Sequence, residues 1–83
     1  MIDRRRLGEY VQRHMSKKDN SICNLERIKR YEDAIQAGIT DQLGGCWWEH
    51  TGLDPFRLMF LEGYSADKTI DLIAADINAR ALA

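Results

Sequence analysis

The sequence predicts an all-α protein, a compact bundle or orthogonal array of four main helices, for three reasons. Apolar residues recur at intervals of three and four, as on one face of a helix, and nowhere alternate for long enough to predict a strand. Capping residues, glycines and a proline separate these stretches. The chain has 83 residues, enough for one modest core, so we expect residues 1–83 to form a single helical domain.

The first helix is expected at about residues 4–16. Asp3 is a suitable N-cap, because its carboxylate can accept hydrogen bonds from free backbone N–H groups of the first turn. Polar residues 16–20 are expected to connect this helix to the next. The apolar stripe of the helix comprises Leu7, Tyr10, Val11, His14 and Met15.

The second helix is expected at about residues 22–37, with Ser21 as its cap. Its apolar residues follow a spacing close to a heptad. Gly38 suits the left-handed conformation that commonly follows the last helical turn, so we expect the helix to stop there.

Two further helices are expected at about residues 55–62 and 66–81. Asp54 followed by Pro55 is a typical helix start, and Ser65 is a suitable cap for the last helix. The helix at 55–62 is apolar almost all round, which predicts a central and buried position. The inner stripe of the last helix comprises Ala66, Ile70, Ile73, Ala74 and Ile77.

Residues 39–53 form an irregular segment that contains Gly44-Gly45 and the unusual dipeptide Trp47-Trp48. Adjacent side chains on a helical turn point about 100° apart, so one small core cannot easily take both rings. We expect one ring to pack inward and the other to be partly exposed. Tryptophan is enriched at the centres of protein interfaces, so Trp47 and Trp48 are candidate partner-binding residues. The alternative is that both rings cover different edges of the core.

Charge is unevenly distributed along the chain. Residues 1–18 hold six Lys or Arg and two Asp or Glu, whereas residues 40–83 hold three and seven, so the molecule has a basic front and an acidic back. Cations at a helix N-terminus oppose the helix dipole, which suggests a role other than stabilising that helix. The candidate binding residues in this basic patch are Arg4, Arg5, Arg6 and Arg13, with Lys17 and Lys18 beside them.

The positive charge of this basic patch favours binding to phosphates or to an acidic protein surface. The alternative is that it pairs with the acidic last helix inside the fold, through Asp67, Asp71 and Asp76. The sequence pI of about 6.1 argues against a dedicated nucleic-acid binder, for which a pI above about 9 is typical.

Cys46 and His50 are four residues apart, so one helical turn would place both on one face. With Cys23 and His14 they make a nominal Cys₂His₂ set, but only one pair has the close spacing of structural zinc sites. The same pair has the residue types of a thiol nucleophile and its base, without an identifiable orienting group. We therefore expect no cofactor, and keep Cys46 and His50 as an alternative metal or thiol site.

The segment LMFLEGYSADKTIDLIA resembles the first half of a helix-turn-helix of the LuxR type. In that family, too, a helix leads through an acidic residue, a glycine and a serine into a new helix. The spacing from the turn to the isoleucine is one residue longer here than in the family pattern. The helix that would enter the groove carries Asp67, Asp71 and Asp76 instead of basic or amide side chains. We interpret the segment as a plain helical hairpin.

The N-terminus has a basic stretch without a following apolar region, so it does not predict a secretory signal, and no apolar run is long enough to span a bilayer. A cytoplasmic location with free thiols is expected. The leading hypothesis is a small non-enzymatic protein that docks on a protein or macromolecular complex, as inhibitors and regulators of the phage or mobile-element type do. The alternative is a nucleic-acid-binding regulator acting through residues 4–18. A homodimer is compatible with the charge pattern, because a basic face on one copy can pair with an acidic face on another.

Overall fold

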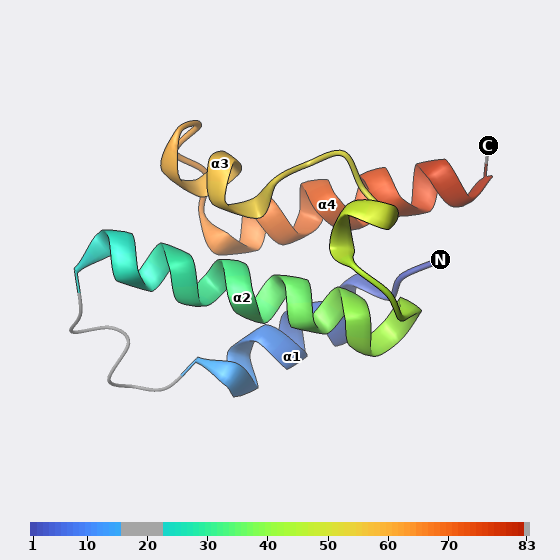
Figure 1. The fold of residues 1–83 in the computed structure, drawn as a ribbon, viewed down its shortest axis with the longest axis horizontal. Helices are drawn as coiled ribbons and strands as arrows, with labels where there is room; N and C mark the ends of the chain where they lie inside the picture. Colours follow the sequence, from blue (N-terminus) through green and yellow to red (C-terminus); the bar gives the residue numbers. More distant parts are fainter. Residues whose placement is uncertain (16–22, 83) are drawn as a thin grey trace.

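The computed structural model describes residues 1–15 and 23–82, and these are built from helices without strands (Figure 1). The predicted all-α class is thereby confirmed. The connection expected at residues 16–20, the cap expected at Ser21 and the helix start expected at residue 22 lie outside the described residues. The elements are α1 (Arg4–His14), α2 (Asn24–Leu43), the short 3₁₀-helix η2 (Trp47–Glu49), α3 (Pro55–Phe60) and α4 (Ala66–Leu82).

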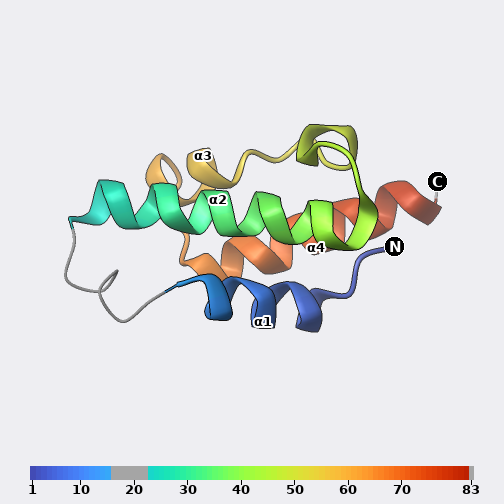
Figure 2. The same ribbon diagram turned by 60° about the horizontal axis from the view of Figure 1, so that its bottom comes forward.

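The core lies where α1, α2 and α4 run alongside one another, with α3 against α2 and α4 (Figures 1 and 2). Leu7 and Val11, one turn apart on α1, are fully buried, as the predicted stripe requires. Full burial of a side chain of this size contributes roughly 1.5–3 kcal/mol. The buried apolar residues are Ile2, Leu7, Val11, Ala34, Ile35, Ile39, Met59, Ile70, Ile73, Ala74 and Ile77.

Helix α2 does not stop at Gly38, as the sequence predicted, but continues to Leu43. Gly38 is a buried residue of the helix interior. A Cβ atom at Gly38 would lie only 2.5 Å from Leu7 Cδ1, so the glycine allows α1 to approach α2 closely. The helix ends instead at Gly44, whose positive φ of 75° is a conformation that favours glycine. Residues 39–43, expected to be irregular, are therefore helical.

Helix α3 is shorter and more exposed than expected. The helix predicted at 55–62 ends at Phe60. Pro55 and Met59 are buried, but Phe60 is 51% exposed and Leu61, which follows it, is 67% exposed. A helix of six residues has less than two turns, so packing on α2 and α4 covers only one of its faces. The prediction of a central, buried helix is wrong for this reason.

Side-chain amides fix the start of the chain between α2 and α4. The backbone N–H of Ile2 donates to Asn78 Oδ1 at 2.7 Å, and Asn78 Nδ2 donates to the Ile2 carbonyl at 3.1 Å. Gln42 makes the same reciprocal pair with the backbone of Asp3, at 2.8 and 3.0 Å. These four hydrogen bonds bring the N-terminus of α1 to the end of α2 and to the C-terminal half of α4.

Asp76 on α4 holds the loop between η2 and α3. Its Oδ2 accepts hydrogen bonds from the Thr51 hydroxyl at 2.5 Å, the Gly52 N–H at 3.2 Å and Arg80 Nε at 3.0 Å. The hydrogen bond from Thr51, with those from Gly52 and Arg80, lowers the pKa of the Asp76 carboxyl below its usual value. Asp76 therefore serves this loop, and it is not the partner of the basic patch that the sequence suggested as an alternative.

Candidate functional site

The two tryptophans lie on a turn that starts with two left-handed glycines. Gly44 and Gly45 have φ values of 75° and 70°, which reverse the chain at the end of α2. The Thr40 hydroxyl, in the last turn of α2, donates to the Gly45 carbonyl at 2.9 Å and holds this reversal. The turn is thus fixed to the helix that precedes it.

Two more hydrogen bonds close the turn around η2. The Cys46 N–H donates to Glu49 Oε2 at 2.6 Å. This is the hydrogen bond of a capping box, in which the side chain three residues after the N-cap accepts the N-cap N–H. His50 Nε2 donates to the Gly44 carbonyl at 2.7 Å. Trp47–Glu49 thus form a 3₁₀-helix in which the Glu49 side chain holds the Cys46 N–H and the His50 side chain holds the Gly44 carbonyl.

The turn separates the two indoles as the sequence predicted. Trp47 is half-buried and packs against the core, whereas Trp48 is 65% exposed. Their ring centroids are 5.9 Å apart at an interplanar angle of 82°, a favourable edge-to-face contact. Trp47 therefore supports Trp48 from the core side and leaves most of the second indole in contact with solvent.

An open hollow of about 350 Å³ adjoins this turn. Its lining comes from the start of the chain, the end of α2, η2 with the residue after it, and the last turns of α4. Figures 1 and 2 show these segments at the same end of the molecule. Met1, which lines it, and Leu82 in the last turn of α4 are 70% and 76% exposed. We call Trp48, Met1, Leu82 and the hollow the aromatic end of the molecule. The hollow is lined by Met1, Leu43, Glu49, His50, Ile77, Arg80 and Ala81.

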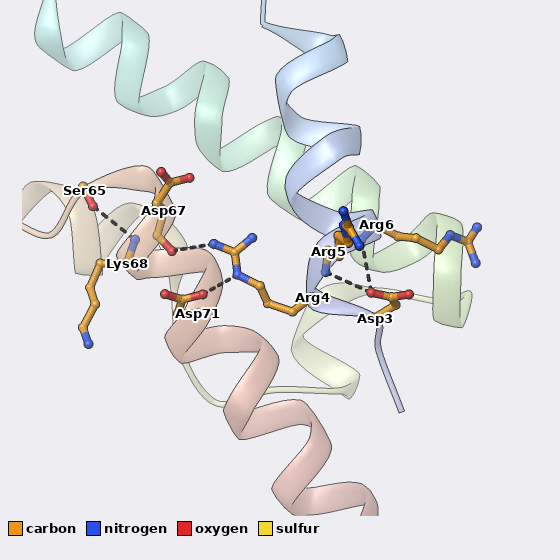
Figure 3. A network of polar contacts seen from close by, with 8 residues as sticks. All are labelled: Asp3, Arg4, Arg5, Arg6, Ser65, Asp67, Lys68 and Asp71. Atoms are coloured by element: carbon orange, nitrogen blue, oxygen red, sulfur yellow. Dashed lines mark hydrogen bonds and ion pairs between the residues drawn. The ribbon is translucent and has the colours of Figure 1, made fainter.

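Figure 3 shows that Arg4 is used inside the fold. Its Nε forms an ion pair with the Asp71 carboxylate on α4, and its NH2 group donates to the Asp67 carbonyl at 3.4 Å. The guanidinium crosses the surface of Gly8, where a Cβ atom would lie 2.6 Å from Arg4 NH1. For Arg4, the alternative that the basic patch pairs with the acidic last helix is therefore correct, and this residue joins α1 to α4.

The other arginines of the patch face outward. Arg5 is 91% exposed and Arg13 77% exposed, and each lies 4.0 Å from a carboxylate oxygen of Glu9 between them. Arg6 forms no ion pair with any residue that the structure describes, and Asp3 Oδ1 accepts its backbone N–H at 3.2 Å (Figure 3). Lys17 and Lys18 lie outside the described residues. An open cleft of about 540 Å³ on this face is lined by Arg4, Arg5, Gly8, Glu9, Gln12, Arg13 and Asp67.

The cysteines and histidines do not form a common site in the described part of the chain. Cys23 and Cys46 are exposed free thiols. His14 stacks on Tyr10 at 4.1 Å and donates from Nδ1 to the Tyr10 carbonyl, while the Nε2 atom of His50 is occupied by Gly44. Within residues 1–15 and 23–82, no three His, Cys, Asp or Glu side chains are placed to hold one metal ion.

A second exposed apolar surface was missed by the sequence analysis. Phe60, Leu61 and Tyr64 are 51%, 67% and 40% exposed, and Phe60 stacks on Phe56 with ring centroids 5.3 Å apart. The signal was present, because α3 is apolar almost all round yet too short to be covered on every side. We call Phe60, Leu61 and Tyr64 the α3 surface.

None of the described helices combines the length and apolar composition needed to cross a membrane. Comparison of the chain with protein-family models, with curated proteins and with solved structures finds no match.

Proposed function

We propose that this protein is a small non-enzymatic binding protein that docks on another protein through its aromatic end. The observation that carries the proposal is the position of Trp48, 65% exposed on a turn that is closed by hydrogen bonds at both ends. Tryptophan is enriched among the residues that contribute most to binding at protein interfaces.

The fixed turn favours binding because little conformational freedom is left to lose. An exposed side chain that becomes immobile in an interface costs about 0.5–1.5 kcal/mol of ordering free energy. Trp48 lies on a 3₁₀-helix with its ring against Trp47, so part of this cost is already met in the free protein. A tryptophan that enters a desolvated pocket commonly contributes 2 kcal/mol or more to binding.

The outward arginines indicate the charge of the partner. Arg5 and Arg6 lie in the first turn of α1, which Gln42 and Asn78 hold at the same end of the molecule as η2. An acidic region beside the apolar contact would complement them and accelerate association. We therefore propose a partner surface that combines an apolar pocket for Trp48 with nearby carboxylates. A protein of this size that covers a functional surface of its partner would act as an inhibitor or regulator.

Affinity capture with paired variants tests the proposal. The wild-type protein and the Leu25→Ala variant, which alters an apolar side chain 48% exposed on α2, should retain the same partner from an extract of the native host. Trp48→Ala should lose that partner while its helical circular dichroism is unchanged. Equal retention by Trp48→Ala would remove the aromatic end as the docking surface.

Nucleic-acid binding is the second candidate, and the cleft lined by Arg4, Arg5 and Arg13 is the observation that favours it. Glu9 and Asp67 line the same cleft and oppose the approach of phosphates. We therefore expect no retardation of duplex DNA or RNA at low salt. Retardation whose log–log salt slope is about 0.9 for each phosphate contact would favour this candidate over protein docking.

A further inference from the structure

The α3 surface lacks a cover within the described chain, although its sequence is that of a buried helix. Helices that are apolar on all faces are normally enclosed. Here Pro55 and Met59 face the core, whereas Phe60 and Leu61 face solvent on the opposite side. Leaving apolar side chains in water is unfavourable by about 25 cal/mol for each Å² of their exposed surface. The pattern is that of a helix whose second face is covered by another chain.

We infer that a second copy of this protein covers the α3 surface and that the protein is a symmetric dimer. A two-fold interface brings a surface against itself, so it must offer both a projection and a recess, and both signs of charge. The α3 surface offers the projection, since Leu61 is 67% exposed. A hollow of about 320 Å³ beside it offers the recess, with Leu53 and Leu58 among its lining residues.

The charges beside the α3 surface are also self-complementary. Arg57 and Glu62 line the same hollow, both are exposed, and neither forms an ion pair with a described residue. In a two-fold contact Arg57 of the first copy meets Glu62 of the second, and Glu62 of the first copy meets Arg57 of the second. A surface of one sign would repel its own copy, whereas this pair offers both signs to a second copy. Asp54, the third charged residue that lines the hollow, is used as the cap of α3, where its carboxylate accepts the Phe56 N–H at 3.0 Å.

The dimer leaves the aromatic end free. Figures 1 and 2 show α3 beside the first half of α2, with η2 and both termini towards the other end of the long axis, which measures 41 Å. The two η2 segments, each with an exposed Trp48, would thus lie outside the shared interface. This inference does not depend on the proposed function, because dimerisation is measured without any partner.

Sedimentation equilibrium over a wide concentration range tests the dimer. The wild-type protein is expected to show a monomer–dimer equilibrium, and Leu61→Asp should raise the dimer dissociation constant at least tenfold. Arg57→Glu should also weaken the dimer, because it opposes Glu62 of the other copy. The exchange of both charges, Arg57→Glu with Glu62→Arg, should restore it. Trp48→Ala, at the far end, is the control and should leave the equilibrium unchanged.

A wild-type protein that remains monomeric at about 1 mM overturns the inference, whatever other molecule binds the α3 surface. So does a dimer that Leu61→Asp leaves intact while helical circular dichroism shows the variant to be folded. A charge exchange that weakens the dimer as much as Arg57→Glu alone would exclude the two-fold pairing. Loss of partner capture by Trp48→Ala with an unchanged dimer would separate this inference from the proposed function.

Discussion

Two buried threonines illustrate how single hydroxyl groups affect this small core. Thr51 is 3% exposed, and its hydroxyl donates to Asp76, whereas Thr69 is fully buried and its hydroxyl has no hydrogen-bond partner in the described structure. A buried polar atom without a partner costs about 1–3 kcal/mol relative to one that is satisfied. The hydroxyl of Thr51 therefore stabilises the folded protein, whereas the hydroxyl of Thr69 destabilises it.

Replacing Thr69 by valine should stabilise the protein by about 1 kcal/mol, because it removes an unsatisfied oxygen with little change of shape. Urea denaturation followed by circular dichroism measures the change. Thr51→Val is the matched control and should destabilise, since it removes a donor from Asp76. Destabilisation by both variants would show that the Thr69 hydroxyl has a partner in solution.

Arg4 and Arg6, both at the start of α1, contribute differently to the stability of the protein. Arg4→Glu places a carboxylate beside Asp71 and breaks the contact between α1 and α4, so we expect a loss of roughly 1 kcal/mol in stability. Arg6→Glu removes no ion pair within the described structure, and its charge suits the helix dipole, so the change should stay within about 0.5 kcal/mol. Thermal unfolding distinguishes the two, and equal effects would contradict the assignment of Arg4 to the fold.

At the scale of elements, locally determined features could be predicted from the sequence. Asp3, Asp54 and Ser65 cap their helices as expected, because a cap acts on backbone groups two or three residues away. The role of Gly38 could not be predicted. It depends on the contact with Leu7, which is remote in sequence, and in isolation a glycine near the end of an apolar stripe is indistinguishable from a helix stop.

The same limit applies to the candidate site. The separation of Trp47 from Trp48 could be predicted, because adjacent side chains on any helical turn diverge. The exposure of Phe60 and Leu61 could not, because it depends on how much of α3 its neighbours cover. The pairing of Arg4 with Asp71 was one of two alternatives in the sequence, and only the packing of α1 on α4 distinguishes them.

The two glycines within helices provide a test of element packing. Alanine is favoured over glycine in a helix by about 1 kcal/mol, so Gly8→Ala, which displaces only the flexible end of Arg4, should be neutral or stabilising. At Gly38 the new methyl group would meet Leu7, which is fully buried and cannot move aside. Gly38→Ala should therefore cost about 1–3 kcal/mol in urea denaturation. A stabilising Gly38→Ala would contradict the close approach of α1 and α2.

At the scale of the whole molecule, the uneven charge of the sequence is partly compensated by folding. Arg4 from the basic front pairs with Asp71 from the acidic back, which joins the first helix to the last. Arg5, Arg6 and Arg13 remain exposed. Arg5 and Arg6, in the first turn of α1, and the aromatic end both lie towards the end where the N-terminus meets η2, whereas Arg13 lies in the last turn of α1. The α3 surface lies towards the other end of the molecule.

In this arrangement the helical bundle separates two exposed apolar surfaces. Self-association at the α3 surface and partner binding at the aromatic end would produce a bivalent protein, in which two Trp48 side chains act together. Linked binding of this kind can raise apparent affinity by about 10²–10⁴ for a partner that is itself multivalent. A partner with a single site would gain nothing from the dimer.

A binding titration with the captured partner is the decisive test of docking through Trp48. The dissociation constant should be measured by calorimetry for the wild-type protein, Trp48→Ala and Leu25→Ala, with circular dichroism of each. We predict that Trp48→Ala raises the dissociation constant at least about tenfold, equivalent to about 1.4 kcal/mol, while Leu25→Ala leaves it unchanged. An unchanged dissociation constant for folded Trp48→Ala would show that the partner does not bind through Trp48.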